Sequence, residues 1–311
     1  MNPAFSVIVF TTVAGAAQGL VVALAFGVLC GVDLGAAFLG HALLVAAGLL
    51  VVGLGASFLH LGRPERAWRA AMMWRTSWLS REVIVLPAFI GVVGLWWLAL
   101  RYRPPGALTS VWLPLAAIAV AALLWYCTAM IYACLRFIEE WAHPLTLVNF
   151  VLSGLSSGLL LACALGAFAG AEDLVRAAGP AALAATLFGW AGRIAALRRN
   201  ASIRHRSTLQ SATGIQAPNL VQKSMGMSAG SFNTREFFHR ASLAGLKRIK
   251  LALVLFGYAA PALLAAWALA TQAAWPWWSA VLLQAPGLVA DRWFFFAQAK
   301  HPQNLYYQVV S

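Results

Sequence analysis

Residues 36–60, AAFLGHALLVAAGLLVVGLGASFLH, contain no Asp, Glu, Lys or Arg and are long enough to cross a lipid bilayer. A transmembrane helix needs about 20 predominantly apolar residues. Seven more apolar runs follow the same rule, at residues 4–30, 82–101, 111–135, 146–170, 178–197, 250–272 and 276–297. We therefore predict an all-α polytopic membrane protein, with eight transmembrane helices forming a single domain over residues 1–311.

Composition excludes the soluble alternatives. Of the 311 residues, 62% are hydrophobic and 10% are charged, against about 25% charged in a typical soluble protein. A soluble fold of this size would leave large apolar patches exposed to water. The apolar runs are continuous, whereas the strands of a membrane β-barrel alternate. Helices are therefore the expected spanning structure.

The positive charges predict the orientation. With eight spans, 19 of the 22 Lys and Arg residues fall on the side of the two termini and 3 on the other. Cytoplasmic loops carry the excess of Lys and Arg, so we place both termini in the cytoplasm. The net charge of +13 is then an orientation signal. Because the chain has no spaced stacking aromatics and no nucleic-acid-binding motif, we expect no nucleic-acid partner.

The longest segment between apolar runs is a basic cytoplasmic loop at residues 198–249. Asn233 to Glu236 have the spacing of a helix N-cap with a capping acid. The apolar and basic residues after them predict a short amphipathic helix on the surface of the lipid membrane. A docking surface for a partner protein is compatible with that reading, and the basic residues proposed for docking are Arg66, Arg235 and Arg240.

Candidate chemistry gathers at the cytoplasmic ends of the second and third predicted helices. His60 ends the second helix, and Glu82 begins the third. Arg63 and Arg81 lie at the same predicted depth, and such a group could hydrogen-bond a quinone carbonyl and relay its protons. Tyr132 is directed toward the same face. For Glu82, an acid that only complements the helix dipole is an equal alternative, and Asp291 could simply pair with its neighbour Arg292.

Haem and metal sites are not expected in this chain. His41 and His60 are the only histidines in a span, both in the second one, and 19 residues of helix separate them by about 28 Å. They cannot ligate one haem iron. The four cysteines form no C-x-x-C motif and no cluster with histidine, so we expect no iron–sulfur or other metal site. The two halves lack paired helix breaks, which disfavours a transporter built from inverted repeats.

Residues 58–64, FLHLGRP, with LSRE at residues 79–82 resemble the eight-helix membrane anchor of dimethyl-sulfoxide-reductase-type molybdoenzymes. MIYA at 130–133, WAHPLT at 141–146 and GSFNTREFF at 230–238 resemble one branch, the anchor of the cytoplasmic sulfite dehydrogenase complex. The resemblance covers most of the chain.

The resemblance implies two partner subunits, a molybdopterin catalytic subunit and an iron–sulfur subunit. It also implies a quinone, either ubiquinone or menaquinone, with which the anchor exchanges electrons. It also implies quinone-site roles for His60 and Glu82; Arg63, Arg81, Tyr132 and Arg292 are added by position.

The expected location is the bacterial inner membrane, among its lipids. Because the family's His-Leu-Gly end faces the iron–sulfur subunit, the charge count places the catalytic partners in the cytoplasm. This orientation favours sulfite oxidation that delivers electrons to quinone. Two alternatives remain: quinol oxidation for a dimethyl sulfoxide or related reductase, and a secondary transporter.

Overall fold

The computed structural model describes residues 4–59, 61, 63–103, 106–204, 206–220, 243–300 and 302. Within these residues the regular structure is entirely helical. The long helices are α1 (Phe5–Leu29), α2 (Ala36–Phe58), α3 (Trp78–Tyr102), α4 (Leu113–Ala133), α5 (Pro144–Ala169), α6 (Glu172–Ala201) and α11 (Trp275–Ala297). One further long helical stretch consists of three consecutive elements, α9 (Leu243–Val254), the π-helical turn η4 (Leu255–Ala259) and α10 (Ala260–Thr271). The shorter helical elements are η1 (Pro64–Ala71), η2 (Leu108–Trp112) and α7 (Leu209–Thr213).

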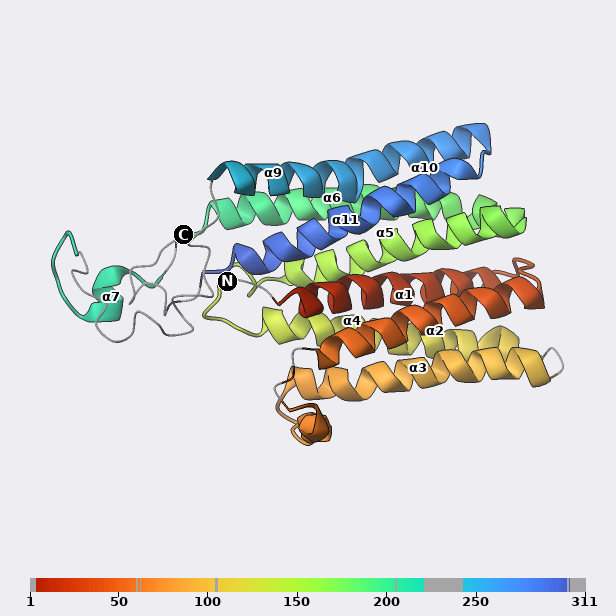
Figure 1. The fold of residues 1–311 in the computed structure, drawn as a ribbon, viewed down its shortest axis with the longest axis horizontal. Coiled ribbons are helices and arrows are strands. Elements are labelled where there is room, and N and C mark those ends of the chain that lie inside the picture. The colour runs from red at the N-terminus through yellow and green to blue at the C-terminus, as the bar shows by residue number, and fades with distance from the viewer. Residues whose placement is uncertain are drawn as a thin grey trace.

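The long helices form one elongated bundle (Figure 1). Seven helical stretches among the described residues are long and apolar enough to cross a membrane, which confirms a multi-pass helical fold. α11 is not among the seven, yet its 23 residues extend about 34 Å at 1.5 Å per residue, and it runs alongside the others. α1 begins at the end of the bundle where α11 finishes (Figure 1).

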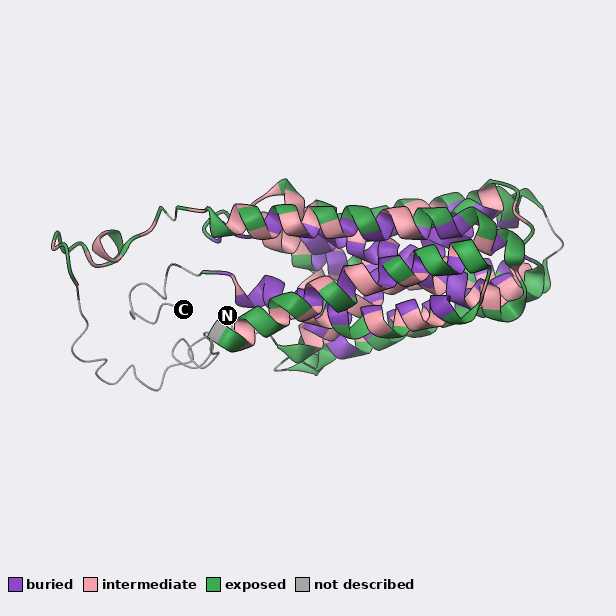
Figure 2. Ribbon diagram, turned by 90° about the horizontal axis from the view of Figure 1, so that it is seen from above, coloured by how far each residue is buried: buried purple, intermediate pink, exposed green. Residues whose placement is uncertain are grey.

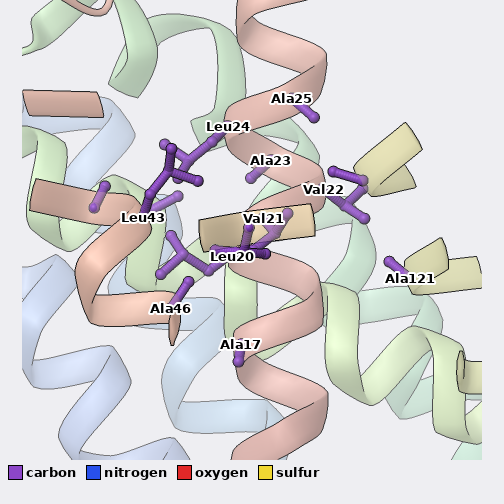
Figure 3. Close-up of a cluster of buried hydrophobic side chains, with 14 of the residues drawn as sticks. Ala17, Leu20, Val21, Val22, Ala23, Leu24, Ala25, Leu43, Ala46 and Ala121 are labelled. Atoms are coloured by element: carbon purple, nitrogen blue, oxygen red, sulfur yellow. The ribbon is translucent and has the colours of Figure 1, made fainter. Parts of the chain in front are cut away.

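α1 lies at the centre of the bundle. In its most apolar stretch 67% of the residues are buried, against 33% in α2 and 28% in α3. Leu20, Val21 and Leu24 of α1 pack beside Leu43 and Ala46 of α2 (Figure 3). Figure 2 shows the exposed residues along the outer faces of the helices, with the buried ones between them. The outer faces are the surface left for lipid.

Glycines let α1 and α5 touch backbone to backbone. Each helix carries two glycines four residues apart, at positions 15 and 19 in α1 and 154 and 158 in α5. A Cβ built on Gly158 would overlap backbone atoms of Gly19 and Leu20. Small residues at this spacing are a general device for close helix packing in membranes, where the hydrophobic effect does not drive helices together.

Three helices begin at least four residues before the predicted spans, and the first of them is α3, at Trp78 and not at residue 82. α6 begins at Glu172, six residues before the predicted start, and includes residues 198–201 of the predicted loop. α9 begins at Leu243 and joins the next span directly. Leu, Ala, Arg and Lys are strong helix formers, so the basic ends of these helices continue beyond their apolar cores. Residues 233–242, where the surface helix is predicted to begin, lie outside the described residues.

Candidate functional site

A cavity of about 190 Å³ lies between α1, α2, η1, α3 and α4, at the end of the bundle where α2 finishes. Its walls are mainly apolar, with Phe10, Leu54 and Leu86 among them. The polar side chains in its lining are those of Ser57, Glu82 and Tyr132. An apolar pocket with a few convergent polar groups is the usual form of a small-molecule site.

Glu82 enters the cavity from the second turn of α3. Ser77 caps this helix, and its side chain accepts a hydrogen bond from the backbone nitrogen of Ser80, 3.3 Å away. Glu82 is only 5% exposed, and its carboxyl group accepts a short hydrogen bond from the Thr128 hydroxyl of α4. A carboxyl group withdrawn from water at membrane depth is costly, and such groups generally have a function.

Tyr132 belongs both to the cavity wall and to an aromatic cluster behind it. Its ring stacks on Phe150 with centroids 5.8 Å apart, and it meets Trp141, Phe295 and Phe296 edge-on at 5.3, 5.5 and 5.2 Å. Aromatic pairs in these geometries stabilise one another beyond simple burial. The cluster therefore fixes the position of Tyr132 at the cavity.

His60, a leading candidate from the sequence, lies outside the described residues. Phe58, two residues before it in the chain, and Leu61, directly after it, both line the cavity. Its role stays a prediction.

The predicted arginines are dispersed. Arg63 is exposed and precedes η1, outside the cavity lining. Arg81 points away from the cavity: it donates to the carbonyl oxygens of Trp74 and Arg75, both at 2.9 Å, and lies 4.0 Å above the Trp78 ring. It anchors the segment that follows η1 to the start of α3. The docking candidate Arg66 is exposed beside Glu65 at 3.9 Å; Arg235 and Arg240 lie outside the described residues.

Arg292 occupies a different place, between α5 and α11. It donates to the Ser153 hydroxyl, and its guanidinium lies 3.8 Å above the Phe150 ring. Its neighbour Asp291 does not pair with it; the Asp291 carboxylate instead lies 2.5 Å from Nε of Arg193 in α6. All three charged side chains are buried. Phe150 contacts both the Arg292 guanidinium and the Tyr132 ring, but neither Phe150 nor Arg292 lines the cavity.

This buried cluster was not predicted from the sequence. Arg193 is one of the 19 basic residues assigned to the side of the two termini, but its side chain is 2% exposed. An intramembrane ion pair across 98 residues of sequence leaves no local spacing pattern. Arg193 and Asp291 both lie within predicted spans, and an ionisable residue within a span generally has a partner. That rule could have predicted that each of the two residues is paired.

The cavity suits one ring of a quinone. A protein cavity of about 150 Å³ accepts a benzene molecule, so about 190 Å³ accommodates a substituted six-membered ring. The apolar walls match the ring, and Glu82 and Tyr132 offer polar groups for its oxygens. Among the described residues, no group of three or more His, Cys, Asp or Glu side chains could hold a metal ion.

Residues 1–283 match the family model described as DMSO reductase anchor subunit (DmsC). The chain belongs to this anchor-subunit family. It is 46% identical to a subunit of the sulfite dehydrogenase of Allochromatium vinosum over 326 aligned positions, covering all of both chains. It is 35% identical to the anaerobic dimethyl sulfoxide reductase chain YnfH of Escherichia coli, over 38% of this chain and 41% of that one.

Membership of an anchor family confirms the predicted class of the protein and its place in a complex. The anchor has partner subunits, a molybdopterin catalytic subunit and an iron–sulfur subunit.

Proposed function

We propose that the anchor passes electrons from the iron–sulfur subunit to membrane quinone at the cavity lined by Glu82 and Tyr132. The observation that carries this proposal is the buried Glu82 carboxyl group at the wall of an otherwise apolar cavity. Reduction of a quinone takes up two electrons and two protons, so the site needs a proton donor as well as an electron source.

Glu82 supplies that donor. Its carboxyl group holds a proton beside the ring oxygen, and the Thr128 hydroxyl keeps the side chain in one orientation. Tyr132, held by its aromatic neighbours, provides a hydroxyl donor for a ring oxygen. The apolar lining excludes bulk water from the ring. His60 is proposed to complete the relay to the aqueous side.

Sulfite is the proposed source of the electrons. The full-length relationship to a sulfite dehydrogenase subunit supports this substrate more than the partial relationships to dimethyl sulfoxide reductase chains do. The catalytic partner, not the anchor, would bind sulfite.

The proposed topology has eight spans, with α11 as the eighth, and both termini in the cytoplasm of a bacterial inner membrane. Counting α11 makes the number of spans even, in keeping with α1 beginning and α11 finishing at one end of the bundle. The 19 to 3 distribution of Lys and Arg supports a cytoplasmic position for that end.

Quinol oxidation for a sulfoxide reductase is the second candidate. The family description and the 35% identity to a dimethyl sulfoxide reductase chain favour it. A transporter role has no support from an anchor family.

Glu82→Gln tests the site, because glutamine keeps the size of the side chain and can accept from Thr128 but cannot carry a proton. In the purified complex, the sulfite-dependent reduction of a soluble quinone should fall at least about 100-fold, the lower range for general acid catalysis. Electron transfer from sulfite to an artificial acceptor, and the molybdenum and iron content, should not change. His60→Ala should behave in the same way.

Glu172→Gln is the matched control, because Glu172 begins α6 at the opposite end of the bundle. It should leave the quinone rate unchanged. A full quinone rate in Glu82→Gln would refute the proposed site. A complex that reduces sulfoxides with quinol but does not oxidise sulfite would favour the second candidate.

A reporter fused after Gln216 tests orientation. A cytoplasmic reporter should be active there and a periplasmic one silent. The opposite pattern would reverse the topology and remove the charge argument for sulfite.

A further inference from the structure

A second and larger cavity lies far from Glu82, at the opposite end of the bundle. This groove measures about 410 Å³ and lies between the first turns of α2 and the last turns of α3. Its lining consists of Ala36, Ala37, Gly40, His41, Leu44, Trp97, Leu100 and Arg101. The volume falls within the range of ligand-binding pockets.

The groove follows from side-chain size along two helix faces. On α2, residues 37, 40, 41 and 44 share one face, and on α3, residues 97, 100 and 101 do. Alanine and glycine on α2 leave space opposite the Trp97 indole, whose Nε1 is 3.9 Å from the place of a Cβ on Gly40. The groove is therefore a gap between two helix faces, lined by apolar residues together with His41, Trp97 and Arg101.

Three hydrogen-bond donors converge on this gap. Arg101 and His41 are exposed, and in the described part of the chain Arg101 forms no ion pair. Trp97 Nε1 has no hydrogen-bond partner among the described residues either. A guanidinium, an imidazole and an indole N–H line this one groove. Together they offer donors to a phosphate group, and arginine binds phosphate oxygens in a bidentate manner.

We propose that this groove binds one anionic phospholipid. Its phosphate lies against Arg101 and His41, and one acyl chain extends along Gly40 and Leu44 beneath Trp97. A lipid with a cationic headgroup fits less well, because no carboxylate lines the groove to receive an ammonium group. Among the described residues the guanidinium of Arg101 has no carboxylate partner and lies 5.7 Å from the centroid of the Tyr102 ring. Its positive charge therefore favours a net negative lipid.

Native mass spectrometry of the complex extracted in mild detergent tests the proposal. The wild-type complex should carry one phosphatidylglycerol or cardiolipin per anchor. The double variant His41→Gln, Arg101→Gln should lose at least tenfold of that occupancy. Gly40→Leu fills the groove without removing a donor and should displace the lipid as well.

Arg103→Gln is the matched control, because Arg103 is exposed two residues beyond Arg101 and does not line the groove. It should retain the lipid. Undiminished occupancy in the double variant, a zwitterionic lipid at equal occupancy, or a quinone as the mass that is lost would each overturn the proposal.

A second measurement does not depend on the variants. The Tm of the delipidated wild-type complex should rise on addition of phosphatidylglycerol and not of phosphatidylcholine. Equal shifts with the two lipids would contradict the proposed selectivity. Because the groove and the Glu82 cavity are at opposite ends of the bundle, loss of the lipid and loss of quinone reduction are separable results.

Discussion

Gly158→Ala should loosen the bundle at its centre. The added Cβ would lie within 3 Å of three backbone atoms of Gly19 and Leu20. Ordinary contacts begin near 3.4 Å, so the new atom would be more than 1 Å too close. Backbone atoms cannot rotate away as a flexible side chain can. The two helices must therefore separate.

The expected cost follows from two opposing terms. Overpacking of a well-packed interior costs about 1–3 kcal/mol and occasionally more, and a gap of 0.5–1 Å forfeits a quarter to a half of the dispersion energy of each affected atom pair. Alanine returns about 0.5–1 kcal/mol through helix propensity. We expect a net loss of about 1–2 kcal/mol, or about 5- to 30-fold in the folding equilibrium.

The assay is SDS-induced unfolding of the purified anchor in mixed micelles, followed by tryptophan fluorescence. Gly48→Ala is the matched control, because Gly48 is in the interior of α2 and a Cβ there meets nothing within 4 Å. This control should be as stable as wild type or more stable by up to about 1 kcal/mol. A Gly158→Ala variant as stable as the control would refute the close-contact argument.

Three other predictions concern the buried polar groups and a helix cap. Arg193→Met leaves the Asp291 carboxylate buried without its partner and should cost about 3–5 kcal/mol in the unfolding assay. Adding Asp291→Leu should recover most of that loss. A double variant as unstable as the single one would contradict this prediction. Trp96→Phe removes the 3.1 Å bond from Nε1 to the carbonyl oxygen of Thr109 and should cost about 1–3 kcal/mol, because the buried carbonyl loses its donor; an unchanged unfolding midpoint would count against it. His143 caps α5, because its Nδ1 accepts a hydrogen bond from the Leu145 nitrogen, and burial together with the nearby Arg199 charge lowers the pKa of His143 below 6.5. The unfolded chain therefore binds the proton more readily than the folded one, so the free energy of unfolding should fall as the pH drops below about 6.5. His143→Asn keeps a capping side chain and should remove that part of the pH dependence.

The fold was predictable because each span is encoded by its own run of apolar residues. Residues 36–60, for example, predict α2 to within two residues of its observed end at Phe58. Helix ends were less predictable, as at Glu172, because good helix formers extend a helix beyond its apolar core.

Part of the site was also predictable. Glu82 was identified from its place at a helix end and from the family resemblance, and Tyr132 from its position in the chain; both line one cavity. Partners across the bundle were not predictable. The tertiary fold joins Thr128 to Glu82 by a hydrogen bond and Arg193 to Asp291 by an ion pair. It also brings Gly19 against Gly158 in backbone contact. A single sequence records which residues are small, polar or charged, but not which of them meet.

The contact between α1 and α5 has a consequence for biosynthesis. Gly158 is made 139 residues after Gly19, which takes about 7–28 s at 5–20 residues per second. For that time α1 must remain in the bilayer without its main partner and with its glycine surface facing lipid. Its 25 residues carry no charged side chain, so α1 is stable there as a lone helix. The central helix of the bundle is thus made before α5, and its backbone contact can form only when α5 has been made and inserted.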